Sequence, residues 1–338
     1  MFTRVVLTIC LATFFFSHST ADFGEQIQGG ESIQSSTRVG GLTLLSFNAW
    51  ALPVWIPGMA QAKRYRAIPN KLIEQAPDIL CVQESFAVKF RKRILRGLSD
   101  YYYSGSDYSC NQRIAGPIRK DCYGGLMTFS KYPVIDEEFY PYPTFPGMRI
   151  EEVIGAKGFL LTTVNYQGEM VHVIKTHLYA GADDKSEKYR HLQIKYMHET
   201  LDKVIELDAY PVFLLGDLNT RHPDISCSTS LSASQTYEHV VDKMQFIDPS
   251  HELLDNWYTM DYLNNPYAGT TNGREKLDYC LYRSPSSRLI TTINQHTVFT
   301  GTESISDHLG WWTEVSISGV DWPALAGIEG DYSTVIAE

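Results

Sequence analysis

Basic residues are scarce in this 338-residue chain, which has 29 Lys and Arg against 39 Asp and Glu and a formal net charge of −10. Binding to nucleic acid is driven largely by Lys and Arg side chains that neutralise phosphates. An acidic balance of this size disfavours non-specific attachment to DNA or RNA, so we do not expect nucleic acid as a partner. It leaves room for a local basic cleft.

Long apolar runs are absent beyond the first residues, because no later segment reaches the ~18 uncharged apolar residues of a membrane-spanning helix. The N-terminal segment has a basic start at Arg4, an apolar run over residues 5–16, and small residues Ser19 and Ala21 placed for cleavage. This pattern predicts a signal peptide over residues 1–21 and therefore a secreted or periplasmic protein.

Internal repeats and linkers are also absent between residues 42 and 318. Residues 22–40, rich in Gly, Ser, Gln and Glu, are typical of a flexible leader. We therefore expect one folded domain over residues 41–319, followed by a C-terminal tail over residues 320–338. Buried-looking strands alternate with helical patterns early in this domain and hairpin-like strands follow later, which indicates an α/β fold of stacked sheets flanked by helices.

Cysteine and histidine spacings typical of zinc sites are missing, and there is no CxxC motif. Cys110 and Cys122 lie in a polar loop that contains glycine, and an exported protein favours closing such a loop with a disulfide bond. Cys81 and Cys280 lie in apolar strand patterns, where a buried free thiol is expected.

Polar side chains stand at the ends of several apolar runs, and the central example is PVFLLGDLN at residues 211–219. Gly, Asp and Asn at one strand end can simply form a turn. The series of polar residues at strand ends along the whole chain is harder to explain as turns alone, because strand ends that lie side by side in a sheet gather ligand groups. Its members are Asn48, Glu84, His177, Asp217, Asn219, Asp278, Asp307 and His308.

These residue types point to metal-assisted hydrolysis. Glu84 and Asn48 offer the oxygen ligands that Mg²⁺ prefers, although Glu84 could instead be an acid at a helix N-terminus. His308 can take a proton from water if another group fixes its tautomer, and Asp278 is the candidate for that group. His177 could donate to a phosphoryl oxygen or could be structural.

The motifs SFNAW, ILCVQE, GGLMTFSKYPV, KTHLYAG, LLGDLNT, KLDYCL and SDHLGWW occur in the order found in the DNase I-like endonuclease/exonuclease/phosphatase superfamily, which the chain resembles. The resemblance implies a four-layer α/β/β/α sandwich of two packed mixed sheets, with residues 41–319 as the catalytic domain. It also implies roles for the residues at the strand ends: Glu84 as principal Mg²⁺ ligand with Asn48 nearby and Asp307 beside the metal, Asp217 and Asn219 positioning water or a second cation, His308 as general base supported by Asp278, and His177 at the phosphate.

Within that superfamily the chain is most similar to secreted neutral Mg²⁺-dependent sphingomyelinases, on the segments NAWALPVW and AKGFLLTTV. The resemblance implies hydrolysis of sphingomyelin or a related phospholipid at a membrane surface, with Mn²⁺ or Co²⁺ as substitutes for Mg²⁺ and no obligate protein partner. Lys157, Trp50 and Tyr179 are the predicted substrate-binding residues. Tyrosines near the mouth of the site would suit a choline ammonium.

The chain departs from the secreted bacterial sphingomyelinases in one region. Residues 282–305 lack the paired aromatic tip of the hairpin that those enzymes insert into membranes. Aromatic residues favour the headgroup level of a bilayer, so two loops are alternative contacts, unless they pack against the core. The candidates are Trp50, Trp55 and Ile56 in the first loop and Tyr140, Tyr142 and Phe145 in the second.

Three other functions stay open. A secreted DNase I-like endonuclease would use the same catalytic groups. An inositol-phosphate or phosphoinositide phosphatase is favoured by GDLNTR at residues 216–221, but the PAWCDR signature of that group is replaced by KLDYCLYR. A binding protein on an inactive enzyme fold is disfavoured, because every residue of the strand-end series is present.

Overall fold

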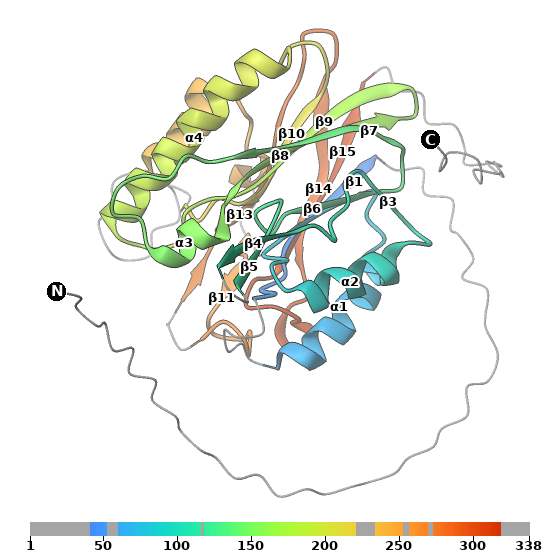
Figure 1. Ribbon diagram of the computed structural model, residues 1–338. Helices are drawn as coiled ribbons and strands as arrows, with labels where there is room; N and C mark the ends of the chain where they lie inside the picture. The colour runs from blue at the N-terminus through green and yellow to red at the C-terminus, as the bar shows by residue number, and fades with distance from the viewer. Residues whose placement is uncertain are drawn as a thin grey trace, which may run out of the picture. The chain divides into compact units, whose positions relative to one another are not determined.

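Two β-sheets face each other in this computed structural model, and helices cover their outer faces (Figure 1). The structure describes residues 41–52, 60–115, 118–220, 234–252, 257–269 and 273–318. The described residues belong to one compact unit. The predicted signal peptide, flexible leader and C-terminal tail lie outside the described residues.

The first sheet has six strands and carries both ends of the described chain. In spatial order they are β14 (Ile290–Val298), β15 (Gly310–Ile317), β1 (Leu42–Asn48), β2 (Ile79–Gln83), β6 (Met127–Ser130) and β3 (Tyr103–Ser104). β1 and β2 are parallel, and helix α1 (Gln61–Gln75) connects them, while helix α2 (Val88–Leu98) follows β2. Parallel strands need such a crossover connection, so the position of α1 follows from the pairing of β1 with β2.

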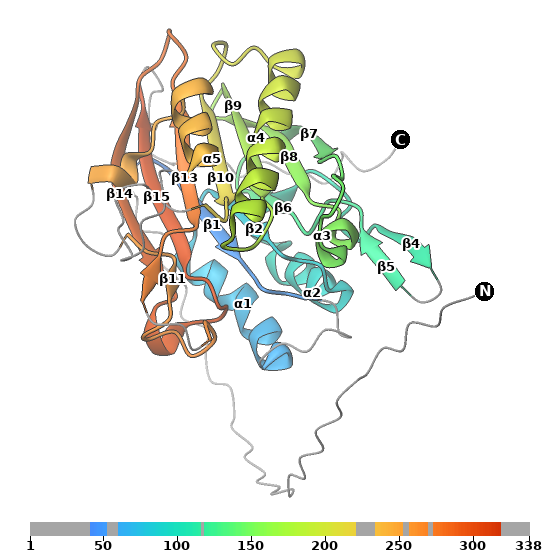
Figure 2. The ribbon, with the colours of Figure 1, turned by 90° about the vertical axis from the view of Figure 1, so that its left-hand side faces the viewer.

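The second sheet has five strands and is also mixed. Its order is β13 (Asp278–Arg283), β10 (Val212–Asp217), β9 (Glu169–His177), β8 (Gly158–Tyr166) and β7 (Val134–Pro141). Helix α4 (Asp184–Val204) begins at Asp183, whose carboxylate accepts a hydrogen bond from the backbone N–H of Ser186 and so caps the helix. Helix α5 (Gln235–Glu238) lies beside α4 (Figure 2) and continues into a π-helical turn, His239–Lys243.

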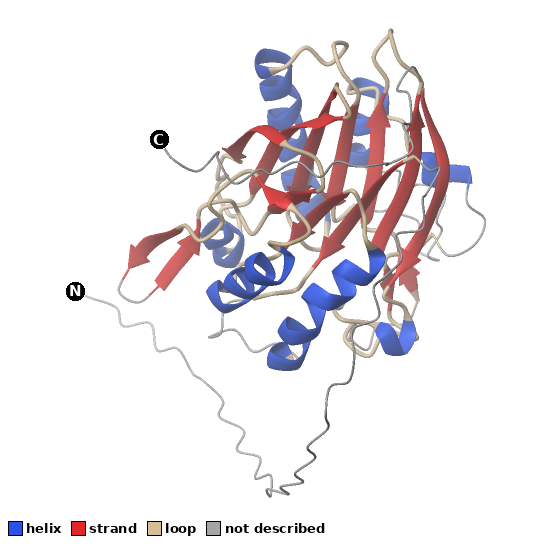
Figure 3. Ribbon diagram, turned by 90° about the vertical axis from the view of Figure 1, so that its right-hand side faces the viewer, coloured by secondary structure: helices blue, strands red, loops and turns tan. Residues whose placement is uncertain are grey.

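The remaining elements are short. They are the two-stranded pairs β4 (Asn111–Ala115) with β5 (Ile118–Asp121) and β11 (Met260–Asp261) with β12 (Arg274–Glu275), helix α3 (Ile150–Gly155), and 3₁₀ turns at Pro249–Glu252 and Gly301–Glu303. The β4–β5 pair extends away from the two sheets (Figure 3). The sequence analysis places Cys110 and Cys122 in a polar loop, and that prediction was wrong for the residues between them that form β4 and β5.

Three apolar layers hold the domain together, and the period-2 alternation of strand side chains separates them. In β1, Leu42 and Leu44 pack between the sheets, whereas Leu45 and Phe47 pack under α1 and α2. In β10, the inward residues pack between the sheets and the outward ones pack under α4 and α5. The four-layer α/β/β/α sandwich is therefore confirmed.

The cysteines follow the predicted pattern where they are described. Cys110 and Cys122 form a disulfide bond, which closes the base of the β4–β5 pair. Cys81 and Cys280 are free thiols, both buried between the sheets. Among the residues that the structure describes, no helix is long and apolar enough to cross a membrane.

Candidate active site

Three neighbouring strands of the five-stranded sheet bring three polar side chains into one row. Asp217 ends β10 and pairs in register with His177 at the end of parallel β9 and with Asp278 at the start of antiparallel β13. Each of them continues the series of alternate residues that faces the other sheet, such as Phe213 and Leu215 before Asp217. The row therefore lies between the two sheets, at one end of the sandwich.

Gly216 permits this row to form. It has a φ of 145°, and a Cβ atom at this position would lie 2.0 Å from the backbone oxygen of Thr176 in β9. Any side chain would push β10 away from β9 just before Asp217 and His177. The glycine in GDLN is therefore required by the close approach of the two backbones.

The six-stranded sheet supplies Asn48 and Glu84 from the facing side. Asn48 ends β1 and Glu84 directly follows β2, so parallel pairing places them at the same end. The Asn48 side-chain amide donates to Oε1 of Glu84 at 3.1 Å and to Oδ2 of Asp217 at 3.0 Å. Its Oδ1 accepts from the backbone N–H of Trp50 at 3.0 Å. Asn48 thus connects carboxylates that belong to different sheets.

Three residues of this region have a left-handed backbone. The φ angles are 44° at Trp50, 54° at Glu84 and 50° at Asn219. Asn adopts this conformation readily, but Trp and Glu do so rarely. Backbone strain of this kind is concentrated in functional sites, so these values support the assignment of the strand ends as a site.

His308 lies in the loop before β15 and contacts two of the acids. Its Nδ1–H donates to Oδ2 of Asp278 at 2.7 Å, and its Nε2 lies 3.7 Å from Oδ2 of Asp217. A carboxylate only accepts, so Nδ1 carries the proton and Nε2 faces Asp217. Burial lowers the pKa of His308, but the charges of Asp278 and Asp217 outweigh burial and raise the pKa well above 6.5.

The carboxylates of the site repel one another and are poorly solvated. Burial, followed by the charge of Asp307, raises the pKa of Glu84 to about 7. Burial also raises the pKa of Asp217 to about 6. Ligand atoms of Glu84, His177 and Asp217 lie within 4.8 Å of one another, as do those of Asp217, Asp278 and His308. A buried excess of negative charge with this spacing is suited to hold a cation.

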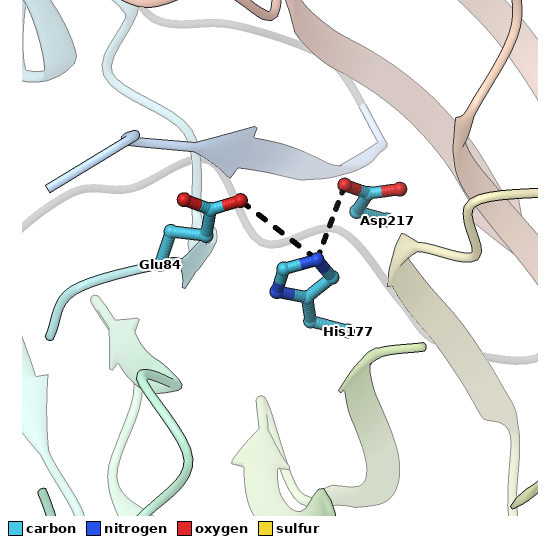
Figure 4. Close-up of side chains that lie close together, drawn as sticks. All are labelled: Glu84, His177 and Asp217. Carbon is cyan, nitrogen blue, oxygen red and sulfur yellow. Dashed lines mark ion pairs between the residues drawn. The ribbon is translucent and has the colours of Figure 1, made fainter. Parts of the chain in front are cut away.

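His177 stands between the carboxylates and a lysine. Its Nε2 lies 3.5 Å from Oδ2 of Asp217 and 3.8 Å from Oε1 of Glu84 (Figure 4). The Nζ of Lys157 lies 3.1 Å from the same nitrogen and 3.0 Å from Oε2 of Glu152. Burial, then the charges of Lys157 and His308, lower the pKa of His177 well below 6.5, so its ring is neutral. An ammonium only donates, so Nε2 accepts from Lys157.

Asn219 and Asp307 complete the series. The backbone N–H of Asn219 donates to Oδ1 of Asp217 at 2.8 Å, and its side-chain amide donates to the Leu178 carbonyl at 3.2 Å. Oδ1 of Asp307 accepts from the backbone N–H of His308 at 3.1 Å. The structure therefore brings all the predicted strand-end residues to one end of the sandwich.

The three predicted substrate-binding residues make different contacts. Lys157 contacts His177, and Trp50 adjoins Asn48 with the guanidinium of Arg64 4.5 Å from its ring centroid. Tyr179 is buried, with 2% of its surface exposed, and its hydroxyl accepts from the backbone N–H of Arg149 at 3.1 Å. The guanidinium of Arg149 in turn lies 3.6 Å from Oε1 of Glu152, which is the partner of Lys157.

The predicted membrane-contact loops are only partly described. Trp55 and Ile56 lie outside the described residues. In the second loop, Tyr142 is buried, the Tyr140 ring stacks on Phe159, and the Phe145 ring stacks on Tyr189. These aromatic side chains therefore pack against the protein, which was the alternative considered from the sequence.

Two residues that sequence reasoning missed hold the loops of the site in place. Arg64 in α1 donates to the carbonyls of Ala49 at 3.0 Å, Trp50 at 2.9 Å and Ile305 at 3.3 Å. The Asn265 amide donates to the carbonyls of Ser306 at 2.9 Å and Asp307 at 2.8 Å. Both act on backbone oxygens of remote segments, and no local sequence pattern identifies such contacts.

Comparison with known sequences gives relatives of two kinds. Sphingomyelin phosphodiesterase 5 of Danio rerio is 25% identical over 301 residues, which cover 74% of this chain and 54% of the relative. Tyrosyl-DNA phosphodiesterase 2 of Xenopus laevis is 24% identical over 266 residues, which cover 74% of this chain and 60% of the relative. The chain thus spans little more than half the length of these curated relatives.

Solved structures share the fold. Sphingomyelinase C from Streptomyces griseocarneus superposes with a TM-score of 0.61 at 22% identity, over 81% of this chain and 99% of that chain. A beta toxin mutant from Staphylococcus aureus with bound magnesium ions gives a TM-score of 0.61 at 21% identity, also over 81% and 99%.

The model of the Endonuclease/Exonuclease/phosphatase family matches residues 45–308. This interval contains the whole five-stranded sheet and, of the six-stranded sheet, every strand except β15 and the start of β1, and it runs from the strand that carries Asn48 to His308. The predicted superfamily is therefore confirmed, and the chain belongs to the endonuclease/exonuclease/phosphatase family.

Proposed function

We propose that this protein is an exported Mg²⁺-dependent phosphodiesterase that hydrolyses sphingomyelin, or a related phospholipid, to ceramide and phosphocholine. The observation that carries the proposal is the contact of His308 with Asp278 at 2.7 Å. Asp217 lies beside this pair and also contacts His177. Asn48 connects Asp217 to Glu84 by hydrogen bonds to both. These contacts support a mechanism in which a histidine base and a bound cation act on one phosphate. The sphingomyelin phosphodiesterases among the relatives support the choice of substrate.

The donor set fits Mg²⁺. Glu84 and Asp307 provide carboxylate oxygens, and Asn48 holds Glu84 in place, so these three residues would hold the ion. Mg²⁺ needs few protein oxygens because it keeps several waters. When bound, it would stabilise negative charge on the phosphoryl oxygens and offset the carboxylate charges that raise the pKa values of Glu84 and His308.

The chain's own groups can perform the proton transfers. Nε2 of neutral His308 takes a proton from the water that attacks phosphorus, while Asp278 holds the other ring nitrogen and stabilises the imidazolium that forms. Asp217 and Asn219 orient the water and the phosphate. As the bond from phosphorus to the ceramide oxygen breaks, the ammonium of Lys157, which Nε2 of His177 holds in place, stabilises the negative charge. The ceramide oxygen takes a proton from solvent, and His308 returns to solvent the proton that it took from the attacking water.

The decisive experiment is mass spectrometry of mixed phospholipid vesicles incubated with the purified protein, with and without Mg²⁺ and chelator. We expect phosphocholine and ceramide to appear with Mg²⁺, to vanish with chelator, and to fall by about 10²–10⁴-fold in His308→Ala. His296→Ala is the matched control, because this half-buried histidine contacts the Trp312 ring, at 4.7 Å between centroids, and does not belong to the strand-end series. Wild-type release of phosphocholine by His308→Ala would refute the mechanism.

A nuclease is the second candidate, favoured by the match to tyrosyl-DNA phosphodiesterase 2. The same preparation is therefore incubated with supercoiled plasmid and with a 5′-tyrosyl oligonucleotide. The excess of acidic residues leads us to expect no cleavage of either. Cleavage of DNA together with inactivity on every phospholipid would reverse the choice between the two.

A further inference from the structure

The Glu84 side chain points in a direction that its strand does not predict. In β2, Leu80 and Val82 pack in the apolar layer under α1 and α2, and period-2 alternation would place Glu84 on the same side. Its Oε1 instead accepts from the side-chain amide of Asn48 at 3.1 Å and lies 3.8 Å from Nε2 of His177 in the other sheet. The φ of 54° at Glu84 accompanies this change of direction. A left-handed glutamate is rare and persists only where its surroundings hold it.

Backbone groups of two neighbouring segments hold the turn at Glu84. The Glu84 carbonyl accepts from the backbone N–H of Ala51 at 2.9 Å. The backbone N–H and the hydroxyl of Ser85 both donate to the carbonyl of Gly125, at 2.9 Å and 2.8 Å. Gly125 packs so closely that a Cβ atom there would lie 2.8 Å from the ring of Phe86. The turn is therefore joined to the segment that precedes β6.

Arg91 reaches the same turn from α2, which lies beside α1 on the outer face of the six-stranded sheet (Figure 1). Its Nη1 donates to the carbonyl of Ser85 at 2.9 Å and to that of Phe86 at 2.8 Å. Its Nη2 donates to Oδ1 of Asn111. A planar guanidinium presents several donors in a fixed arrangement, so this one side chain fixes two consecutive carbonyls directly after Glu84.

The charge of Arg91 is balanced by a second buried side chain. Oδ2 of Asp121 lies 3.8 Å from Nη1 of Arg91, and both side chains are 2% exposed. The carboxylate of Asp121 also accepts from the backbone N–H groups of Tyr123 and Gly125. A buried charge is costly unless it is paired and hydrogen-bonded, and both conditions are met here. The ion pair thus connects the residues that follow Glu84 with the segment to which they are bonded.

We propose that Arg91 is a positioning residue for the Mg²⁺ site: through the carbonyls of Ser85 and Phe86 it holds Glu84 in the left-handed turn that directs its carboxylate into the site. This inference rests on the Mg²⁺ site of the proposed function. The contacts of Arg91 are with carbonyls and with side chains of the β4–β5 pair, so its effect passes through the backbone of the ligand. Without these bonds the turn relaxes toward an ordinary backbone conformation, and Mg²⁺ binds more weakly.

The test measures Mg²⁺ binding directly, by calorimetry on the full-length protein without lipid, with MgCl₂ as the probe. Arg91→Lys keeps the charge beside Asp121 but loses the fixed arrangement of donors. We expect it to raise the Kd for Mg²⁺ by about 10-fold, a size typical of residues that orient a metal ligand. Arg93→Lys changes an exposed arginine of the same helix and is the matched control, with an unchanged Kd.

A double-substitution cycle shows whether Arg91 acts through Glu84. Glu84→Gln removes the charge that binds the ion, so adding Arg91→Lys to it should change the Kd by less than twofold. Excess Mg²⁺ should restore kcat on phospholipid in Arg91→Lys, whereas it would not restore a protein that has lost its structure. Circular dichroism in the presence of chelator checks that each variant is folded.

A second variant tests the same contacts if Arg91→Lys does not fold. Arg91→Met combined with Asp121→Asn removes both charges of the buried pair, so that neither stays buried without its partner. We expect this double variant to raise the Kd for Mg²⁺ at least as much as Arg91→Lys does.

Three results would overturn the proposal. Wild-type Mg²⁺ affinity in folded Arg91→Lys, or in the double variant, would show that the turn does not need the arginine. Independent, multiplying effects of Arg91→Lys and Glu84→Gln on the Kd would show that Arg91 does not act through Glu84. Absence of Mg²⁺ binding by the wild-type protein would overturn the proposal together with the Mg²⁺ dependence of the proposed function, whereas the first two results leave that function intact.

Discussion

The imidazole of His308 and the carboxylate of Asp278 meet at 2.7 Å in a part of the sandwich where Asp278 has no exposed surface. Asp278→Asn replaces an acceptor by a group that can also donate to Nδ1, which would place the proton on Nε2 and prevent that nitrogen from taking one. We expect kcat to fall by about 10²–10⁴-fold with little change in KM. Steady-state kinetics on sphingomyelin micelles measures both.

Asp136→Asn, an exposed carboxylate in β7, is the control for this substitution. A kcat within twofold of wild type in Asp278→Asn would show that the histidine does not need this partner. A KM that falls as much as kcat would also contradict the orienting role of Asp278, because we expect KM to change little.

Glu84→Gln tests the cation site. The amide keeps the size of the side chain but removes the charge that we assign as principal Mg²⁺ ligand. We expect the Mg²⁺ concentration for half-maximal activity to rise at least 10-fold, and saturating Mg²⁺ to restore part of the activity. Activity measured against Mg²⁺ concentration checks this, with the exposed Glu138→Gln as control. An unchanged Mg²⁺ profile would remove Glu84 from the site.

Lys276 predicts a dependence of stability on pH. It is 1% exposed, its Nζ has no hydrogen-bond acceptor among the described residues and lies 3.4 Å from the Trp311 ring centroid, and burial lowers its pKa to about 8. Below pH 8 the folded state holds a buried charge, at a cost of about 3 kcal/mol relative to the unfolded value of 10.5. Between pH 8 and 10.5 the unfolded state binds more protons, so the cost disappears as pH rises.

Lys276→Met removes this cost together with two cation–π contacts, to Trp311 and Tyr279, which together contribute about 1 kcal/mol. We therefore expect the free energy of unfolding to increase by about 2 kcal/mol at pH 7, with the gain shrinking toward pH 10.5. Urea denaturation at several pH values measures it, with the exposed Lys203→Met as control. A loss of stability at pH 7 would contradict the prediction.

The Cys110–Cys122 disulfide should stabilise only its own neighbourhood. It closes a loop with a sequence separation of 12, for which chain entropy predicts about 3 kcal/mol. The β4–β5 pair forms a sheet of its own, and an isolated two-stranded pair is marginally stable. We expect the double variant Cys110→Ser, Cys122→Ser to be cleaved faster by protease within this segment while phospholipid hydrolysis stays within twofold. A loss of activity would link the pair to the site.

The residues at strand ends could be predicted from the sequence because they follow apolar runs whose alternation also fixes their direction. Asp217 and Asp278 illustrate this, since each continues the inward series of its own strand. The order of the strands could not be derived in this way, because pairing depends on contacts between distant segments. The resemblance of the motifs to a known superfamily supplied the four-layer arrangement of two mixed sheets, and the strand order comes from the structure.

Arg64, Asn265 and the β4–β5 pair were missed for physical reasons. Arg64 is charged and sits in an amphipathic helix, where a solvated position is the normal expectation, yet it is 1% exposed and bonded to carbonyls. Asn265 reads as a turn residue next to Pro266. Residues 111–121 have no alternation of apolar side chains, so a disulfide-closed hairpin there leaves no periodic signal.

The in-register row of His177, Asp217 and Asp278 also determines how the site can be dissected. Its spacing is set by the main-chain ladder of β9, β10 and β13 and not by the side chains themselves. Truncating one member therefore leaves the others at their original coordinates, so single and double substitutions can be combined in thermodynamic cycles without repositioning the rest. Glu84 and His308 project from segments outside regular strands. Substitutions at these two residues therefore lack a strand ladder that keeps their neighbours in place.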